Sequence, residues 1–314
     1  MKYLPNLILL LLASQSVAQH TNFNTQRNWS LNKKEVFIGG GVTQFTGDLG
    51  GRNRIGTDFS VADIDLPSTS WNFEIGYRYR FHPYWATSTV LNFGHLKGDD
   101  SNTGEITRRS RNLHFRSTIV ELSQRLEVIV IANEKFGARY NISRHRKRMK
   151  DHNEQVYLFA GMGVGYFNPK ALFNGRWVEL RPLRTEGQGL VDGPNEYSLI
   201  TATVPVGIGF RYGINRMWRI GLEATYVKTF SDYIDDVSGT YYSQNELAQQ
   251  VGSASAYLSN PSTENTPWFS AGQQRGDVEK DAYYYINLKI IRNVTYRDYA
   301  RQRKIHHWKG RYKF

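Results

Sequence analysis

The sequence predicts an all-β protein: an eight-stranded antiparallel transmembrane β-barrel of the outer-membrane class, with long outer loops. Three observations support this prediction. Apolar residues recur at every second position in eight segments, which is the period of a strand with one apolar face. Long and short connections alternate between these segments, and aromatic residues gather at the ends of the apolar faces, as they do in membrane barrels.

The composition limits the other possibilities. The 314 residues include 28 glycines, 14% aromatic residues and no cysteine, and the formal net charge is +12. Without cysteine, disulfides and thiolate metal sites are excluded. The mean hydropathy of −0.54 excludes a bundle of membrane helices, whereas alternating strands average to such a value even in a bilayer.

The N-terminus predicts a secretory signal peptide. Lys2 precedes an apolar run at 7–13, and Ser16-Val17-Ala18 supplies a small-x-small cleavage site. The apolar run is shorter than the roughly 20 residues of a membrane helix, which disfavours an uncleaved anchor. We therefore divide the chain into a signal peptide (1–18), a short N-terminal periplasmic segment (19–34), the barrel (35–293) and a basic periplasmic tail (294–314).

The first three predicted strands cover residues 35–45, 71–81 and 84–95. Glycines at 39, 40 and 41 interrupt the alternation of the first strand. In the second, the odd positions from Trp71 to Phe81 are apolar and mostly aromatic, while the even positions include charged residues. A face of this kind needs water or partner charges. The His82-Pro83 pair makes a short turn into the third strand.

Residues 113–130 and 156–166 form the fourth and fifth predicted strands. The first half of the fourth is out of phase with its second half, so we expect a β-bulge in this strand. In the fifth, Gly161, Gly163 and Gly165 alternate with apolar residues. Glycines that face a lumen leave room for large neighbours such as arginine and tyrosine.

The last three predicted strands cover 200–212, 218–226 and 282–292. A tight turn from Gly213 to Arg216 joins the first two into a β-hairpin. Both of its apolar faces continue for about ten residues, the length that a tilted strand needs to cross a bilayer. Aromatic residues cap both ends of these faces, which fits lipid outside and a small polar lumen inside.

The connections predict the orientation. Those at 46–69, 97–112, 167–196 and 231–280 are long, those after the second and sixth strands are tight turns, and only the basic linker at 135–150 breaks the alternation. Outer-membrane barrels have short periplasmic turns and longer external loops. We therefore expect an outer-membrane protein with both termini in the periplasm.

Alternation alone does not decide which face lies inside. A soluble lipocalin-like barrel would place its apolar face around a ligand. Here the polar face holds many charges and glycines, and aromatic residues cap the apolar face, which favours a polar lumen. The predicted lumen charges are Glu74, Arg78, Arg80, Glu121, Arg125, Arg211, Glu223 and Lys289.

The interior of an eight-stranded barrel is just wide enough for side chains to fill. Unpaired charges there would cost several kcal/mol each. We therefore expect a paired polar plug that closes the pore; a proton or ion path is the alternative.

Catalytic and metal chemistry find little support. The eight histidines show no metal-ligand spacing, so we predict no metal and no cofactor. His95, His114 and Asp232 could lie near the outer rim, where some outer-membrane enzymes have their active sites, but no nucleophile with a neighbouring base is visible. We therefore predict no catalytic residue and no enzyme.

Two loop motifs have simple interpretations. Asp232, Asp235 and Asp236 lack the spacing of a calcium-binding loop, and we expect a solvated acidic strand end. The Arg275-Gly276-Asp277 tripeptide is expected to form a turn.

Two basic segments lie on the periplasmic side by strand parity: RHRKRMK at 144–150 and the tail at 297–314. Nucleic acid is the usual partner of such runs, but a signal peptide argues against it. We expect an anionic protein, lipid headgroup or cell-wall component instead, with solubilising charge as the alternative. The predicted partner-binding residues are Arg144, Arg146, Lys147, Arg148, Lys150, Arg301, Arg303 and Lys304.

Several motifs follow one another along the chain: GDLGG (47–51), FNPKA (167–171), RTEGQG (184–189), VPVGIGFRYGI (204–214), KTFSDYIDDVS (228–238), GQQRGD (272–277) and a basic tail ending in YKF. Together they resemble the PorG-like outer-membrane barrels of the Bacteroidota type IX secretion system. The resemblance covers most of the mature chain. It departs at the apolar VIVIANEKF segment (128–136) and in the extended loop at 241–267.

This resemblance implies a non-enzymatic barrel of a protein secretion machine, set among outer-membrane lipids and docked to periplasmic ring proteins that include a lipoprotein. It identifies no catalytic residue. Two other functions stay open: a small ligand-binding or porin-like barrel, and an outer-membrane enzyme.

Overall fold

The computed structural model describes residues 32–49, 66–102, 106–134, 153–214, 217–262, 267–277 and 279–294. Its strands are β1 (Lys34–Thr46), β2 (Ser70–Arg80), β3 (Trp85–Asp99), β4 (His114–Glu134), β5 (Asn153–Phe173), β6 (Arg176–Glu179), β7 (Ile200–Gly213), β8 (Trp218–Thr229) and β9 (Ala282–Asn293). Its α-helices are α3 (Ile106–Arg111), α4 (Gln244–Gln250) and α5 (Ser253–Ser259). The signal peptide, the linker at 135–150 and the tail from 295 onward lie outside the described residues.

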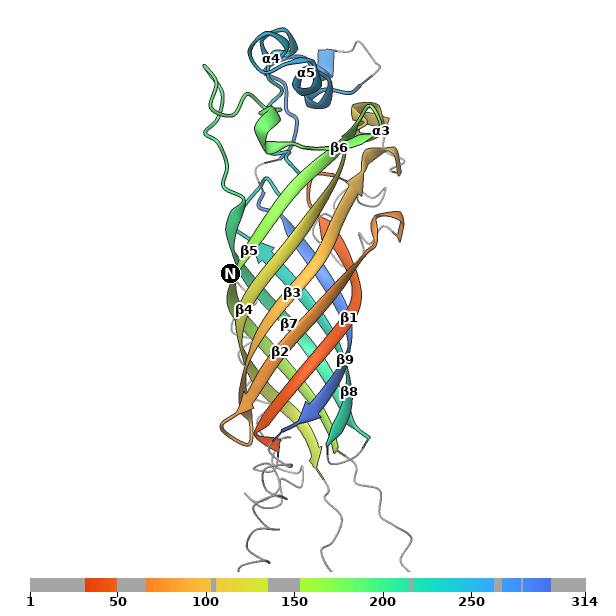
Figure 1. Ribbon diagram of the computed structural model, residues 1–314, viewed down its shortest axis with the longest axis vertical. Coiled ribbons are helices and arrows are strands. Elements are labelled where there is room, and N and C mark those ends of the chain that lie inside the picture. The colour runs from red at the N-terminus through yellow and green to blue at the C-terminus, as the bar shows by residue number, and fades with distance from the viewer. Residues whose placement is uncertain are drawn as a thin grey trace, which may run out of the picture.

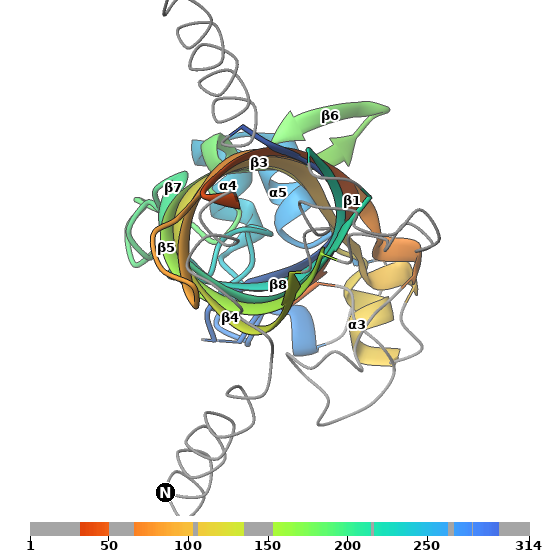
Figure 2. The same ribbon diagram turned by 90° about the horizontal axis from the view of Figure 1, so that it is seen from below.

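Eight of the nine described strands close into a barrel. Each strand pairs antiparallel with the next along the chain, and β1 pairs with β9 to complete the ring, from Glu35 opposite Asn293 to Thr46 opposite Ala282. Figure 2 looks along the barrel and shows the closed ring, with β6 projecting outside it. The predicted eight-stranded antiparallel barrel is confirmed.

The long connections gather at one end of the barrel. Helices α3, α4 and α5 and the β5–β6 hairpin lie at the upper end in Figure 1, and the short β2–β3 and β7–β8 turns lie at the other. Both described ends of the chain, at the start of β1 and the end of β9, lie at the short-turn end. The alternation of long loops and short turns is therefore as the sequence predicts.

Alternation along the strands divides their two faces. In β2, all the odd positions from Trp71 to Tyr79 are at least 36% exposed, while Glu74, Arg78 and Arg80 are fully buried. The same division holds in β9, where Ile286, Leu288 and Ile290 are exposed and their neighbours are buried. The outer surface is therefore an apolar belt suited to lipid. No helix in the described part of the chain is long and apolar enough to span a membrane.

Strands β3, β4 and β5 extend beyond the predicted segments. The connection expected to begin at residue 97 starts after Asp99, and the one expected from 167 starts with seven more residues of β5. These residues fold back through Asn174 and Gly175, both with positive φ, to pair with β6. Asn-Gly is the preferred pair for such a two-residue turn. Pairing thus continues past the apolar belt, where hydropathy no longer marks the strand.

The β4 strand has a bulge, but not for the predicted reason. Its register shifts between Ile129 and Ile131, whereas its first half alternates without a break. That half looked out of phase because Phe115 and Ile119 are apolar and yet face inward. They belong to an apolar layer inside the barrel.

Candidate functional site

The lumen at the short-turn end is filled by a buried ion network. Glu35 accepts hydrogen bonds from Arg78 Nη1 (2.9 Å), Arg211 Nη1 (3.2 Å) and Arg219. Glu127 accepts from Arg78 Nε (2.6 Å) and Arg211 Nη2 (3.3 Å). All five side chains are at most 2% exposed. Burial of this kind is tolerated only when every charge has close partners.

A second group of charges lies in the middle of the lumen. Glu223 Oε1 accepts from Arg125 Nη1 (2.8 Å) and forms an ion pair with Lys289 Nζ (2.7 Å), and its Oε2 accepts from the Tyr157 hydroxyl (2.5 Å). Lys289 Nζ also lies 3.0 Å from Glu74. The ring of Tyr157 lies under the Arg211 guanidinium, 4.1 Å from ring centroid to Cζ. Tyr157 therefore links the two groups of charges.

All eight predicted lumen residues are buried inside the barrel. Seven lie in or beside the two groups above; Glu121 accepts from the Tyr283 hydroxyl (2.6 Å). The eighth, Arg80, lies at the turn end and donates to the Pro83 carbonyl (2.6 Å). We name these eight, with the three residues of the next paragraph, the lumen network.

Three members of the lumen network were missing from the predicted set: Glu35, Glu127 and Arg219. Each occupies a polar position of an alternating strand, so strand parity was the available signal. In the described lumen, five glutamates thus face six cations. The groups neutralise one another and fill the interior, so the arrangement is that of a paired plug.

An apolar layer covers the plug on its loop side. It contains Phe45, Phe115, Ile119, Phe167 and Tyr283, among other buried side chains. The Phe45 and Phe115 rings meet edge to face, with centroids 4.9 Å apart. The layer separates the lumen network from the loops.

Above this layer, residues from the long connections form a second polar cluster, which we name the loop cap. Arg111 binds Asp100 (Nε to Oδ2, 2.7 Å), the Arg275 carbonyl (2.6 Å) and the Asp48 carbonyl (2.7 Å). Asp48 in turn accepts from the Asp277 amide (2.9 Å). One guanidinium thus joins three connections that are far apart in the sequence.

Arg275 makes the second junction of the loop cap. Its Nη1 donates to Glu186 Oε1 (2.9 Å) and to the Asp236 carbonyl (2.7 Å). The Asp236 carboxylate accepts from the Thr185 hydroxyl (2.5 Å) and the Tyr197 hydroxyl (2.6 Å). The side chain of Arg275 is therefore an internal structural element of the cap.

The acidic run at 232–236 is buried, contrary to the expected solvated strand end. Asp232, Asp235 and Asp236 are at most 2% exposed. Burial raises the pKa of Asp236 to about 6 and that of Asp48 to about 7. Each carboxylate has donors within the cap: Asp236 accepts from the Thr185 and Tyr197 hydroxyls, Asp235 from the Leu49 and Val237 amides, and Asp232 from the Ser238 hydroxyl. The cap therefore holds several acids whose protonated form is favoured by the fold.

The candidate catalytic residues do not form a site. The His114 Nε2 accepts from the Leu172 amide (3.0 Å), His95 Nδ1 lies 3.3 Å from the Thr118 hydroxyl, and Asp232 accepts from the Ser238 hydroxyl (2.6 Å). Each thus has a local partner. Within the described residues, no group of three or more His, Cys, Asp or Glu side chains suits a metal ion.

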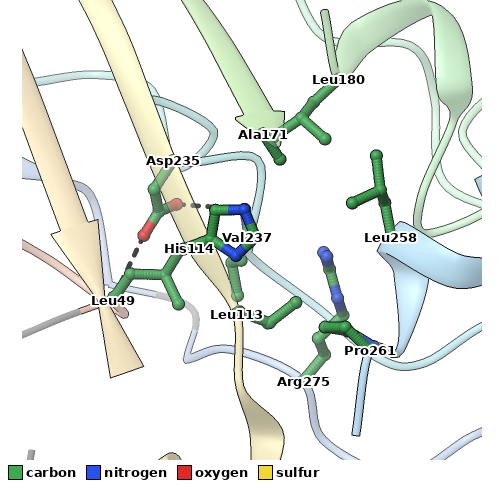
Figure 3. Close-up of a pocket in the computed structure, with 10 residues that line it drawn as sticks. All are labelled: Leu49, Leu113, His114, Ala171, Leu180, Asp235, Val237, Leu258, Pro261 and Arg275. Carbon is green, nitrogen blue, oxygen red and sulfur yellow. Dashed lines mark hydrogen bonds between the residues drawn. The ribbon is translucent and has the colours of Figure 1, made fainter. Parts of the chain in front are cut away.

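Figure 3 shows the small pocket beside His114. It is lined mainly by apolar side chains, with Asp235 accepting from the Leu49 amide (3.2 Å) and the Val237 amide (3.0 Å). Its free volume of about 10 Å³ is at the limit for one water molecule. It has no room for a substrate.

The predicted partner-binding residues cannot be placed. The five cations of the linker at 144–150 and the three of the tail at 301–304 lie outside the described residues.

A comparison with protein families agrees with the architecture. A family model described as "Outer membrane protein beta-barrel domain" matches residues 7–252. A comparison with curated proteins finds no match.

Similar solved structures include Ail of Yersinia pestis in complex with the heparin analogue sucrose octasulfate (10% identity, TM-score 0.33, covering 82% of this chain and 99% of that one). Neisserial surface protein A is also similar (6% identity, TM-score 0.34, covering 83% of this chain and 96% of that one). So is the N-terminal β-barrel domain of Pseudomonas aeruginosa OprF (8% identity, TM-score 0.29, covering 83% of this chain and 97% of that one). These similarities are too low to carry over any ligand or partner.

Proposed function

Because the chain belongs to the outer membrane protein beta-barrel domain family, we propose that it is a non-enzymatic accessory barrel of a type IX protein secretion machine. The observation that supports this proposal is the convergence of the motifs that resemble PorG-like barrels. Asp48 of GDLGG contacts Asp277 of GQQRGD, and Glu186 of RTEGQG pairs with Arg275. Motifs spread over 230 positions thus form one loop cap, a shared unit and not a series of unrelated turns.

In this proposal the barrel is an anchor and not a conduit. The lumen network and the apolar layer fill the interior, which suits a component that holds an assembly in the membrane. The signal peptide directs export, the loop cap faces outward, and both termini lie in the periplasm. The β2–β3 and β7–β8 turns offer little surface there, so the basic linker and tail are the proposed contacts with a periplasmic ring that includes a lipoprotein.

Charge reversal tests this proposal. Replacing Arg144, Arg146, Lys147, Arg148 and Lys150 with glutamate, together with the tail cations, should abolish co-purification of ring proteins, because opposite charges across an interface guide and hold the partner. Raised salt should weaken the wild-type complex, since exposed pairs are screened within about 8 to 10 Å.

The control reverses two cations at the loop end, the exposed Arg181 and the half-buried Arg184, and should leave the complex intact. Retention of the folded, heat-modifiable gel band would show that the barrel itself survives. Full recovery of the ring by the linker-and-tail variant at low salt would refute docking through these charges. Steady ion conductance of the purified barrel in a planar bilayer would favour the porin-like alternative.

A further inference from the structure

The outer surface of the barrel has a row of cations just beyond the apolar belt. Lys97 in β3 is directly opposite Arg116 in β4, and Arg116 is directly opposite Lys170 in β5. All three occupy outward-facing positions of their strands, and Arg116 and Lys97 are exposed. Neighbouring strands lie about 4.8 Å apart, so the three backbone positions span about 10 Å. We name these three residues the basic row.

The register places the basic row at a defined depth. Two pairs nearer the membrane centre, the same three strands present Phe93, Val120 and Tyr166 side by side, and Phe93 and Tyr166 are about 40% exposed. These residues form the aromatic edge of the belt. The four residues from Phe93 to Lys97 rise about 10 Å along a tilted strand. Lipid headgroups occupy the 5 to 8 Å beyond the hydrocarbon core, and lysine and arginine side chains reach back toward them.

The β5–β6 hairpin holds one cation of the row in place. Trp177 in β6 stacks on Arg116, with 3.8 Å between the ring centroid and Cζ. Trp177 is opposite Leu172, and both are about 40% exposed. β6 projects outside the ring (Figure 2) and pairs with the part of β5 that begins at Lys170, so the hairpin lies beside the row.

The charges of the row are only partly neutralised by the protein. Lys170 pairs with Glu179 at 3.0 Å, and their side chains are 33% and 50% exposed. Within the described part of the chain, neither Lys97 nor Arg116 forms an ion pair with a carboxylate. Guanidinium and ammonium groups at headgroup depth are suited to phosphate oxygens.

We propose that the basic row binds the phosphate group of a glycolipid in the leaflet on the loop side of the membrane. Arg116 supplies a fixed fork of donors, Lys97 and Lys170 flank it, and the belt below accepts the acyl chains. The inference depends on the barrel's place in the membrane and is independent of the secretion role, so a failure of ring docking leaves it intact.

Native mass spectrometry of the full-length barrel in mild detergent tests the proposal, with phosphorylated lipid A as the probe and dephosphorylated lipid A as its comparison. The triple variant Lys97→Gln, Arg116→Gln, Lys170→Gln should bind phosphorylated lipid A about 100-fold more weakly, since each of the three cations near an anionic lipid surface contributes about a fivefold factor. Wild type should bind the dephosphorylated lipid as weakly as the triple variant binds the probe.

The matched control is Lys228→Gln, Lys280→Gln, which removes two cations on the far side of the same rim, at β8 and just before β9. It should bind as wild type does. An unchanged affinity in the triple variant, an equal loss in the control, or equal binding of the dephosphorylated lipid would each overturn the proposal. The three substituted side chains face outward, so we expect the triple variant to fold. A heat-modifiable gel band checks that each variant is folded.

Discussion

Replacing Glu223 with alanine should remove several kcal/mol from the free energy of unfolding. Its carboxylate accepts from Arg125 and Tyr157 and pairs with Lys289, and the ion-paired side chains are at most 3% exposed. Without it, the described hydrogen bonds of Arg125 reduce to one with the Ser123 hydroxyl at 3.3 Å. Breaking a buried pair costs about 3–5 kcal/mol. Lys289 keeps its ion pair with Glu74, so Arg125 is the cation that loses its carboxylate partner. We therefore expect a loss in that range.

Glu179→Ala is the matched control. Its partner Lys170 lies 3.0 Å away, close to the 2.7 Å between Lys289 and Glu223, but the Lys170 and Glu179 side chains are 33% and 50% exposed. Water screens such a pair, so the expected loss is about 0–1 kcal/mol. The two variants thus compare similar chemistry inside and outside the barrel.

Urea unfolding of the barrel in phosphatidylcholine vesicles, followed by tryptophan fluorescence, measures both variants. Losses that agree within 1 kcal/mol would refute the buried network. A further check combines Glu223→Gln with Lys289→Met: the double variant should lose less than the sum of the single losses, because each single change leaves a charge without its partner.

Three more outcomes follow from the structure. Gly209→Val should cost about 1–3 kcal/mol, because a Cβ at this glycine would run into the Tyr157 ring; urea unfolding measures the loss. The loop cap should be most stable near pH 4 and lose protection as the pH rises through 7. The reason is that the pKa of Asp48 is raised to about 7, so the folded state holds a proton that the unfolded chain releases near 3.8. Hydrogen exchange of the cap amides, corrected for intrinsic rates, measures this. In the cysteine-free chain, Val191→Cys at the loop end should react with an impermeant maleimide on intact cells, and Ile214→Cys at the turn end should not.

Each of these expectations has a matched control. Gly40→Ala meets only ordinary contact distances on the outer face and should leave unfolding unchanged. Asp48→Asn should reduce the slope of the cap's pH profile near pH 7, while Asp236, whose pKa is raised to about 6, keeps part of the slope at lower pH. An unchanged slope near pH 7 would contradict the assignment to Asp48. Labelling of Ile214→Cys and not Val191→Cys in intact cells would invert the orientation.

The sequence predicts the strands and their faces well because the lipid belt imposes a period of two. The outward positions of β2 from Trp71 to Tyr79 and those of β9 from Tyr284 to Ile290 are all apolar or aromatic, and parity then places the opposite residues in the lumen. Parity also gives Glu127 and Arg219, but only the structure shows that Glu35, at the start of β1, shares Arg78 and Arg211 with Glu127 and binds Arg219 directly.

The loop cap could not be predicted in the same way. Its contacts join residues far apart in the chain; Arg111 and Arg275, for example, are 164 positions apart. No local period marks such contacts, so the acidic run at 232–236 looked solvated. Phe115 and Ile119 misled for a related reason: above the lumen network the interior becomes apolar, and an apolar residue no longer identifies the outer face.

The lumen network also bears on how the barrel is assembled. Glu35 near the start of the barrel binds Arg219, which lies 184 positions later, and Glu223 binds Arg125 from 98 positions earlier. An open, half-inserted sheet would present these charges to hydrocarbon without their partners, at a high cost. They are neutralised together only when β9 has reached β1 in the correct register. The same residues that fill the finished lumen therefore make closure strongly favourable and make a wrong strand order costly, so the network works as an internal check on completion.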